Sequence, residues 1–346
     1  MKAIWLIPPL VAPYASRDDP ERNILACPIA SARLRMGVAA LEWRRGGNEN
    51  VFLDPAAAGA GRRIDLSTAA ICVVSKFYHD APLSAWRDAC LAAKGGRCRL
   101  VIDTSDYPFA KPPPVPEFYS EVLKICDAVV VNSERMGELM SAHTTRPPVI
   151  IEDAILGSMG EPAFAPDSRL ELLWFGHPIN FPYLRSRVGE LVRLASRRRC
   201  RLTVLTLDEL GIRQWTENLE RAHAPGLEAR FIPWSLDVMR LALSECDLVV
   251  LPSDPSDPRK AGASANRLAE ALNAGRLPVA SPLPSYLPFA DAAWVGQDLV
   301  QGIEWALANP REVLVKIRRG QAVVAERFVA DAVGRRWRDL FEGLSN

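Results

Sequence analysis

The chain has 346 residues, a length that suggests two domains. It is 49% hydrophobic and 24% charged, close to the globular average, which excludes intrinsic disorder and a membrane-embedded chain. Its net charge is +1, from 42 Lys and Arg against 41 Asp and Glu. This balance argues against nucleic acid as a partner, because non-specific binding depends on many basic side chains that contact phosphate.

The seven cysteines are dispersed, with no CxxC pair and no His/Cys cluster. We expect reduced thiols in a cytoplasmic protein, neither a disulfide framework nor a zinc site. The uncharged residues 3–16 superficially resemble a signal peptide, but Pro8, Pro9 and Pro13 would break an apolar helix. We therefore expect Ala3–Ile7 to be a buried strand that leads into a loop. No run of about 18 apolar residues predicts a membrane span.

Short apolar runs alternate with amphipathic segments, a pattern typical of parallel α/β proteins. The strands expected in the first half are Ala3–Ile7, Ala70–Ser75, Arg99–Asp103, Ala128–Asn132 and Val149–Ile151. Those expected in the second half are Leu170–Phe175, Arg201–Leu205, Glu228–Ile232, Leu248–Pro252, Leu277–Ala280 and Ala293–Val295. The helices expected between them include Leu83–Ala93, Pro116–Ile125, Val188–Ser196, Asp237–Ser244 and Ala265–Ala274.

Two ten-residue segments, Lys124–Ser133 and Ser244–Ser253, match almost residue for residue. In both, a helix is expected to end in Cys-Asp and a buried strand to stop at Ser. The match predicts two similarly built doubly wound domains, with chance repetition of a common pattern as the alternative. The Gly-, Pro- and Ser-rich segment Gly157–Ser168 is expected to link domains 1–160 and 161–325. Ligands would bind in a cleft at the carboxyl ends of both sets of strands.

The most informative segment runs from Asp247 to Ser285. A buried strand opens into a loop, after which we expect Ser264 to cap a helix that Gly275 closes. Helical spacing puts Leu268, Ala271 and Leu272 on the face that packs on the sheet, and Asn266 and Glu270 on another face.

The start of this helix suits a diphosphate, because free backbone N–H groups and the positive end of the helix dipole lie there. Arg259, Lys260 and Arg267 add positive charge for the same anion. One turn into the helix, the carboxylate of Glu270 is placed to accept hydrogen bonds from two ribose hydroxyls.

Residues 264–281, preceded by 246–253, resemble the donor-binding signature of GT-B glycosyltransferases of the GT4-like superfamily. The resemblance implies two Rossmann-like doubly wound parallel-sheet domains that face each other across a cleft. It also implies that Glu270 holds the ribose of a nucleotide sugar and that the loop before the helix, with Ser264, faces the sugar and diphosphate. The family's earlier acidic residue falls at Gly262, so that half of the signature is absent.

The resemblance extends in weaker form over the second half. Residues 170–177 resemble the first strand of the family's donor domain, ending at the Gly176 turn, and His177 and Asn180 occupy the region of its usual cationic pair. Residues 231–235, with Trp234, resemble the stretch that recognises the base. The closing helices Pro310–Glu326 and Asp331–Leu344 resemble the family's return to the first domain, so we expect residues 326–346 there. Relatives need no metal, so we expect no metal and no cofactor besides the nucleotide-sugar substrate.

Polar residues in the first half are candidates for the acceptor side. Asp103 and Asp106 directly follow a buried strand, where a carboxylate can act as the base for an acceptor hydroxyl or bind its sugar; a strand-end cap is the alternative. Arg33 and Arg35 are candidates for an acceptor phosphate, with a solvated helix face as the alternative. Lys76 at a strand end is a similar candidate.

Other polar features have simpler interpretations. His177 is a candidate donor contact, whereas the other three histidines, at 79, 143 and 223, are expected on the surface. Asp254 and Asp257 imitate a metal-binding pair, but the prolines beside them favour a turn in which Asp is an ordinary hydrogen-bonding residue. The arginine-rich run Arg193–Arg201 favours a solvated helix end, with weak peripheral contact to anionic lipid at the inner face of the membrane as the alternative.

These features lead us to expect a hexosyltransferase that moves a sugar from a nucleoside-diphosphate donor to a hydroxyl acceptor, a glycan or lipid-linked intermediate of polysaccharide biosynthesis. A non-hydrolysing sugar-nucleotide epimerase is a second interpretation, disfavoured by the poor supply of histidine. A nucleotide-sugar-binding protein without transferase activity is a third. The missing acidic residue at Gly262 and the missing cationic pair after Gly176 keep that interpretation open.

Overall fold

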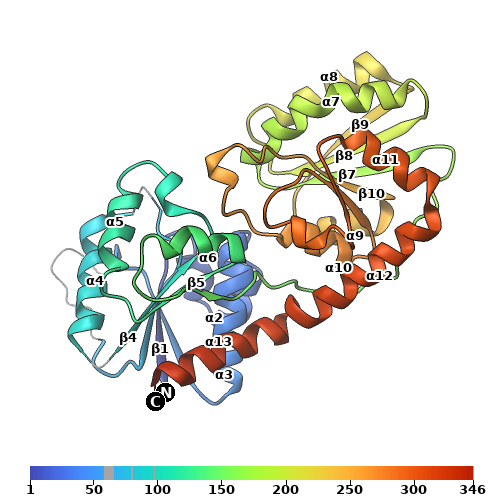
Figure 1. The fold of residues 1–346 in the computed structure, drawn as a ribbon. Helices are drawn as coiled ribbons and strands as arrows, with labels where there is room; N and C mark the ends of the chain where they lie inside the picture. The colour runs from blue at the N-terminus through green and yellow to red at the C-terminus, as the bar shows by residue number, and fades with distance from the viewer. Residues whose placement is uncertain (58–65, 79–80, 97, 346) are drawn as a thin grey trace. The chain divides into compact units, whose positions relative to one another are not determined.

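The computed structural model describes residues 1–57, 66–78, 81–96 and 98–345. The chain divides into two compact units (Figure 1). The first unit comprises Met1–Leu156, Ala261–Ser264 and Arg327–Asn346, and the second comprises Gly157–Lys260 and Ala265–Glu326. The first boundary therefore follows Leu156, where we expected residue 160. The short segment Ala261–Ser264 groups with the first unit, a division that we did not expect.

The first unit is built on a six-stranded parallel sheet with the order β2-β1-β3-β4-β5-β6. Its strands are β1 (Lys2–Leu6), β2 (Glu49–Leu53), β3 (Ile71–Val74), β4 (Arg99–Thr104), β5 (Ala128–Val131) and β6 (Val149–Ile150). Its helices are α1 (Ala12–Ala15), α2 (Pro20–Leu25), the π-helix η1 (Ala32–Gly37), α3 (Val38–Arg45), α4 (Leu83–Gly95), η2 (Pro108–Ala110), α5 (Val115–Val122), α6 (Glu134–Ser141) and α13 (Ala330–Ser345). The strand order reverses between β1 and β3.

Helices cover both faces of this sheet, because alternate residues of each strand point to opposite faces. Ile4 and Leu6 of β1 belong to a core that includes Trp86 of α4 and Phe118 of α5. Trp5 belongs to the opposite core, which α3 and α13 complete. Strands that are buried on both faces read as continuous apolar runs, which explains why they could be located in the sequence.

The closing helix α13 packs against α3 in the first unit (Figure 1). Val333, Trp337 and Phe341 lie four residues apart on its buried face, and the Phe341 ring lies 5.3 Å from that of Trp43. The buried Glu152 carboxylate accepts hydrogen bonds from Arg327, at 2.6 Å, and from Arg336. Apolar packing and two ion pairs to a buried carboxylate therefore hold the C-terminal segment on this unit.

The second unit contains another six-stranded parallel sheet, with the order β12-β11-β10-β7-β8-β9. Its strands are β7 (Leu170–Phe175), β8 (Cys200–Thr206), β9 (Leu227–Pro233), β10 (Leu248–Leu251), β11 (Leu277–Ala280) and β12 (Trp294–Val295). Its helices are η3 (Pro178–Asn180), α7 (Phe181–Ala195), α8 (Ile212–His223), α9 (Leu236–Glu245), η4 (Pro258–Lys260), α10 (Asn266–Asn273), η5 (Leu287–Phe289), α11 (Leu299–Ala308) and α12 (Pro310–Arg327). This is the Rossmann strand order, which reverses between β7 and β10.

The repeated sequence segment forms the same junction in both units. The Asp127 carboxylate accepts a hydrogen bond from the backbone N–H of Leu100 at 2.9 Å. The backbone N–H of Asp127 donates to the Leu100 carbonyl at 2.7 Å. Asp247 makes the same two bonds with Glu171, both at 2.8 Å. Each aspartate thus ties the start of its strand to the neighbouring strand. The prediction of two similarly built domains is confirmed.

The expected linker lies against the end of α10 within the second unit. Gly160 donates its N–H to the Asn273 carbonyl at 2.7 Å, and its carbonyl accepts from Gln321 Nε2 at 2.7 Å. Gly275 follows the helix with a φ of +75° and accepts from Ala163 N–H at 3.0 Å. The left-handed backbone at Gly275 closes α10 as predicted.

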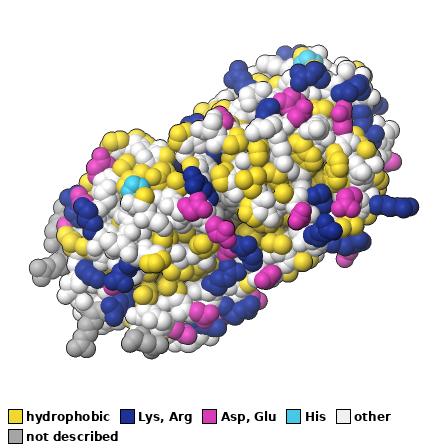
Figure 2. Space-filling view, in the orientation of Figure 1, with side chains coloured by type: hydrophobic (Ala, Val, Ile, Leu, Met, Phe, Trp, Pro, Cys, Tyr) yellow, Lys and Arg dark blue, Asp and Glu magenta, His cyan; other side chains and the backbone are white. Residues whose placement is uncertain are grey.

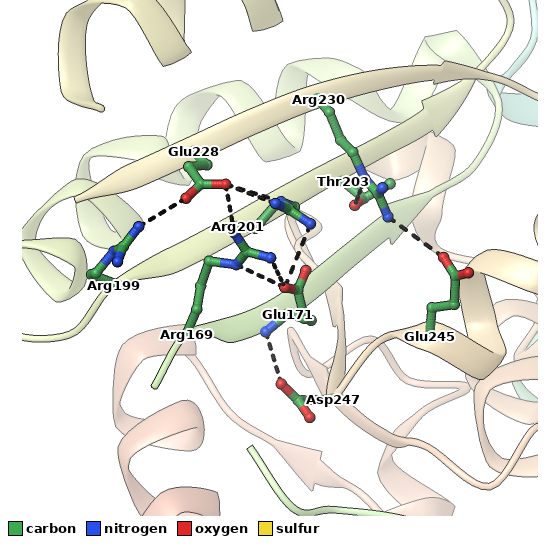
Figure 3. Close-up of polar contacts among 9 residues, drawn as sticks. All are labelled: Arg169, Glu171, Arg199, Arg201, Thr203, Glu228, Arg230, Glu245 and Asp247. Carbon is green, nitrogen blue, oxygen red and sulfur yellow. Dashed lines mark hydrogen bonds and ion pairs between the residues drawn. The ribbon is translucent and has the colours of Figure 1, made fainter. Parts of the chain in front are cut away.

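Charged side chains form a network on the strands β7, β8 and β9 (Figure 3). Glu228 is paired with Arg201 at 2.9 Å, with Arg169 at 2.8 Å and with Arg199 at 3.3 Å. The hydrogen bond from Arg201 is the largest cause that lowers the pKa of Glu228, and the hydrogen bond from Arg169 lowers it further. Arg197 is paired with Glu304 at 2.9 Å, so at least three arginines of the run Arg193–Arg201 are engaged by carboxylates. Contact of this run with anionic lipid stays a prediction.

The surface mixes charges of both signs on the face that Figure 2 shows, in keeping with the near-zero net charge. Across the described ranges, no helix combines the length and the hydropathy that a membrane crossing requires. All seven cysteines are free and buried, as the absence of a disulfide pattern predicted.

Candidate functional site

Ligands of open α/β sheets bind beyond the carboxyl ends of the strands, where the strand order reverses. In the second unit this point lies between β7 and β10. The strand β7 ends at Phe175 and is followed by Gly176, and the segment after β10 leads to Lys260 and then to α10. Four of the predicted donor residues are therefore brought to one edge of the sheet: Gly176, Lys260, Asn266 and Arg267.

Arg267, in the first turn of α10, extends over the end of β7. Its Nη1 lies 3.5 Å from the Phe175 carbonyl oxygen. A Cβ on Gly176 would lie only 3.1 Å from the same nitrogen, so the glycine makes room for the guanidinium. Within the described part of the chain, no carboxylate oxygen lies within 4.0 Å of the Arg267 guanidinium. The site thus carries a positive charge that no nearby acid compensates.

Lys260 adds a second positive charge beside the same strand end. Its Nζ donates a hydrogen bond to Asn180 Oδ1 and lies 5.1 Å from the centre of the Tyr183 ring. Asn180 precedes α7, and its Nδ2 would lie 3.7 Å from a Cβ on Gly176. The amide and the aromatic ring together orient the lysine at this edge.

Arg259, by contrast, is neutralised by a neighbouring acid. Its Nη2 lies 2.6 Å from Asp257 Oδ2, which also accepts a hydrogen bond from Tyr183 Oη at 2.5 Å. The hydrogen bonds from Arg259 lower the pKa of Asp257, and burial together with Asp257 raises the pKa of Tyr183 to about 12. The charge that we expected Arg259 to offer a diphosphate is therefore shared with a carboxylate.

The acidic pair in this loop forms turn contacts, as predicted. Asp254 Oδ1 accepts from the backbone N–H of Ser256 at 2.9 Å and from its hydroxyl at 2.6 Å. Asp257 Oδ1 accepts from the backbone N–H of Arg259 at 2.9 Å. Considering only the residues that the structure describes, no group of three or more His, Cys, Asp or Glu side chains is placed to hold a metal ion.

The start of α10 differs from the prediction. Ala265 occupies the N-cap position and makes no side-chain cap, so the prediction that Ser264 caps this helix is wrong. Asn266 Oδ1 instead accepts from the N–H of Arg267 at 2.8 Å, in the first turn. The helix therefore begins one residue later than expected, and Ser264 groups with the first unit.

The two faces of α10 separate as predicted. Leu268, Ala271 and Leu272 are fully buried, whereas Asn266 and Glu270 are half-buried. Glu270 therefore stands one turn beyond Asn266 on the face that is not packed into the core.

His177 and Trp234 lie on the same edge of the sheet but have structural contacts of their own. The exposed His177 begins the short helix η3, and its Nδ1 accepts from the N–H of Ile179 at 3.2 Å. Trp234 follows β9, the edge strand, and donates its backbone N–H to Thr206 at 2.9 Å. Because β8 separates β9 from β7, Trp234 stands about 10 Å, or two strand spacings, from the end of β7.

In the first unit, Asp106 and Lys76 are brought together at the carboxyl ends of β4 and β3. Lys76 Nζ lies 2.5 Å from Asp106 Oδ2, and Lys111 Nζ lies 3.6 Å from the same oxygen. The Asp106 backbone carbonyl accepts from Thr104 Oγ1 at 2.8 Å. Burial lowers the pKa of Lys76, but the charge of Asp106 more than offsets this and raises it overall.

The two arginines of the first helical region lie in the core. Arg35 is 0% exposed, and its Nη2 donates to Asp103 Oδ1 at 2.6 Å while its Nη1 donates to Asp153 Oδ1 at 2.9 Å. Arg33 is buried and donates to the Cys27 carbonyl at 2.6 Å. The alternative that Arg33 and Arg35 lie on a solvated helix face is therefore wrong for both residues. Roles for Arg33 and Arg35 on an acceptor phosphate stay predictions, although two buried carboxylates already engage the Arg35 guanidinium.

Asp103 differs from Asp106 in its surroundings. Burial raises the pKa of Asp103 even though Arg35 opposes this, and its carboxylate is held by the arginine. It is therefore an ion-pair partner within the core, whereas Asp106 is only half-buried at the strand end. Of the two candidates for the base, Asp106 is the one with exposed surface.

Among the histidines, His143 and His223 are exposed as expected, and His79 lies outside the described residues. His143 Nε2 lies 3.0 Å from Tyr107 Oη, and its ring stacks on that of Phe109 with centroids 3.6 Å apart.

Tyr183 was not among our candidates, because the helix that carries it in its first turn was expected to start only at Val188.

No family model matches the chain, and a search of curated proteins finds no match either. Solved structures do resemble it. Anabaena HepE, in complex with UDP and glucose, superposes with a TM-score of 0.66 at 11% identity over 99% of both chains. A glycosyltransferase from Rickettsia africae gives 0.65 at 12% identity, over 99% of this chain and 98% of its own. Acinetobacter baumannii MurG gives 0.52 at 13% identity over 99% of both. The chain therefore has the GT-B fold of two Rossmann-like domains.

Proposed function

We propose that the chain transfers a sugar from a nucleoside-diphosphate donor to a hydroxyl acceptor. One observation carries this proposal: the uncompensated Arg267 guanidinium lies over Gly176, at the strand-order reversal, in the first turn of α10. A cation and a helix start at one point favour a diphosphate. The fold similarity to HepE, which is in complex with UDP-glucose, supports the same assignment.

The chemistry that we propose requires the leaving diphosphate to be stabilised. Arg267 and Lys260 supply positive charge for this, and the positive end of the α10 dipole adds to it, so the transfer needs no metal ion. On the acceptor side, we assign Asp106 as the base that takes the proton of the attacking hydroxyl. Lys76, at 2.5 Å from Asp106, orients that carboxylate. The acceptor we propose is a glycan or a lipid-linked intermediate, and the transferred group a hexose.

The proposal is tested by screening UDP, GDP and their sugars for thermal stabilisation of the purified chain, in EDTA, and by measuring the release of free sugar. A bound ligand raises the melting temperature by mass action. We expect one sugar nucleotide to stabilise the chain and to be hydrolysed slowly. Stabilisation without any turnover would favour the binding-only alternative, which the glycine at position 262 supports. No stabilisation by any nucleotide would contradict the proposal.

Glu270→Ala is expected to weaken donor binding by about 10-fold, the effect of losing hydrogen bonds to a charged group. Glu270 is half-buried and lies outside the core of the second unit, so the substitution leaves no cavity in that core. Calorimetric titration with UDP measures the affinity, and Glu209→Ala, at an exposed position of the same unit, is the control. Unchanged UDP affinity in Glu270→Ala would remove Glu270 from the site.

Asp106→Asn is expected to lower turnover by about 100-fold or more while leaving donor affinity almost unchanged, because general-base catalysis contributes roughly 10²–10⁴-fold. The amide keeps the shape of the carboxylate but cannot take a proton. Turnover is measured with the donor found in the screen, and affinity by calorimetry. A rate equal to that of the wild type would exclude Asp106 as the base.

A further inference from the structure

Two buried hydroxyl groups of the second unit lack hydrogen-bond partners. The Oγ atoms of Ser253 and Ser285 have none in the described chain, and the two residues are 6% and 9% exposed. In the described part of the chain, the other buried side-chain atoms without a partner are nitrogens or the oxygens of an amide or a carboxylate, so these two are the hydroxyl groups among them. Because buried polar groups are nearly always hydrogen-bonded, such exceptions call for a missing partner, a water or a ligand.

Both serines follow the carboxyl ends of neighbouring strands. Ser253 comes two residues after β10, and Ser285 four residues after Ser281, which directly follows β11. Ser281 ties the two strand ends together, because its Oγ accepts from the N–H of Ser253 at 3.0 Å and its own N–H donates to Leu251 at 3.2 Å. Ser253 therefore lies on a segment that is tied to the end of β11, and Ser285 lies on the segment that follows β11.

The same edge holds the proposed diphosphate site. In the parallel pairing of β10 with β7, Val249 stands opposite Leu173. Continuing that register brings Leu251 level with Phe175, whose carbonyl contacts Arg267, and Ser253 just beyond Gly176. Since neighbouring strands are about 4.8 Å apart, Ser253 lies roughly one strand spacing from the end of β7.

The chemistry of the two groups differs from that of the cations beside them. Arg267 and Lys260 suit the charged diphosphate, whereas a serine hydroxyl both donates and accepts hydrogen bonds, as a sugar hydroxyl does. A ligand hydroxyl that pairs with a buried orphaned group also removes the cost of leaving that group unsatisfied. Neutral hydroxyls next to the cationic part of the edge therefore favour the uncharged portion of a sugar nucleotide.

We propose that Ser253 and Ser285 hydrogen-bond the transferable sugar of the donor and help to determine which sugar nucleotide the chain accepts. This inference rests on the proposed function, and it adds two specificity residues that sequence analysis did not single out. It assigns the sugar to the ends of β10 and β11 and the diphosphate to the end of β7 and the start of α10.

The test compares Ser253→Ala, Ser285→Ala and the double variant with the wild type. Calorimetry gives Kd for UDP, UDP-glucose and UDP-N-acetylglucosamine, and the readout is the ratio of each sugar-nucleotide Kd to the UDP Kd. Ser244→Ala is the matched control, because Ser244 is exposed, precedes β10 and already donates its hydroxyl to the Leu241 carbonyl at 2.7 Å. All variants should fold, because removing an orphaned hydroxyl leaves no partner unsatisfied.

We expect the ratio for the preferred sugar nucleotide to rise about 5-fold in each single variant, the effect of losing one neutral hydrogen bond. The Kd for UDP itself should stay within about 2-fold of the wild type, and Ser253→Thr should restore the ratio. Unchanged ratios with normal UDP binding would overturn the inference. The hydroxyls would then be partners of bound water, and the proposed function would still stand. A parallel loss of UDP affinity would overturn it too. Failure of the wild type to bind these three nucleotides and also GDP and its sugars would remove the proposed function and this inference together.

Discussion

Arg267→Met is expected to weaken the binding of UDP by about 30-fold, or roughly 2 kcal/mol, the largest loss of affinity among the variants of the donor site. The methionine keeps much of the apolar stem of the arginine but removes the one guanidinium that no described carboxylate compensates. The hydrogen bond from the Arg267 side chain to the Phe175 carbonyl is long, at 3.5 Å, so the fold should be preserved without it. Calorimetric titration at two salt concentrations measures the change.

The matched control for this variant is Arg240→Met. Arg240 is an exposed arginine of the second unit that is paired with Asp237 at 3.3 Å on α9. It should bind UDP as the wild type does. Because salt screens a charge–charge attraction, added salt should weaken UDP binding more in the wild type than in Arg267→Met. Equal affinities in Arg267→Met and in the wild type would contradict the placement of the diphosphate.

Arg35→Met is expected to destabilise the first unit by about 3–5 kcal/mol, because it leaves two buried carboxylates without their partner. Arg35 is the common donor to Asp103 and Asp153, and all three side chains are buried. Urea unfolding, followed by tryptophan fluorescence and circular dichroism, should show an earlier transition for the first unit. The transition of the second unit should not move.

The deficit of Arg35→Met should also depend on pH in a defined direction. Burial already raises the pKa of Asp103 in the wild type, and loss of the arginine raises it further. The folded variant therefore binds a proton more readily than the unfolded chain, so its stability is lost as pH rises and partly recovered as pH falls. We expect a smaller deficit at pH 5 than at pH 8. Arg87→Met is the control, since the exposed pair with Glu121 contributes about 1 kcal/mol or less. A loss of stability in Arg35→Met as small as that in Arg87→Met would contradict a stabilising role for the buried ion pairs of Arg35.

The strands were the part of the fold that the sequence predicted best. Every predicted strand is present, with ends that differ by at most one residue. The strand β2 was missed, because this edge strand begins with Glu49 and Asn50 and is only partly buried, so it forms no continuous apolar run. Apolar runs identify strands that are buried on both faces, and they carry little information about an edge.

Helices were predicted less accurately, for a local reason. The helix α7 starts at Phe181, seven residues before the predicted start, with Pro182 in its first turn. Proline is tolerated there because the first N–H groups of a helix have no intrahelical partner, yet in the sequence it suggests a turn. The helix α8 was also missed. Its sequence is largely polar, and only Ile212, Thr216 and Leu219 are buried.

The candidate site was predictable in its residue types and less so in its pairing. Gly176, Lys260 and Arg267 meet at one edge, as the strand and helix pattern implied. The neutralisation of Arg259 by Asp257 depends on how a proline-containing loop folds back on itself, which composition does not reveal. The Arg35 ion pairs join residues 68 and 118 positions apart, and such long-range contacts leave no mark in a local pattern.

The most direct test of the account is a crystal structure of the chain soaked with UDP. It should place the diphosphate oxygens about 2.7–3.2 Å from the Arg267 guanidinium and from backbone N–H groups at the start of α10. UDP bound elsewhere, with Arg267 still uncompensated beside an empty strand end, would contradict it.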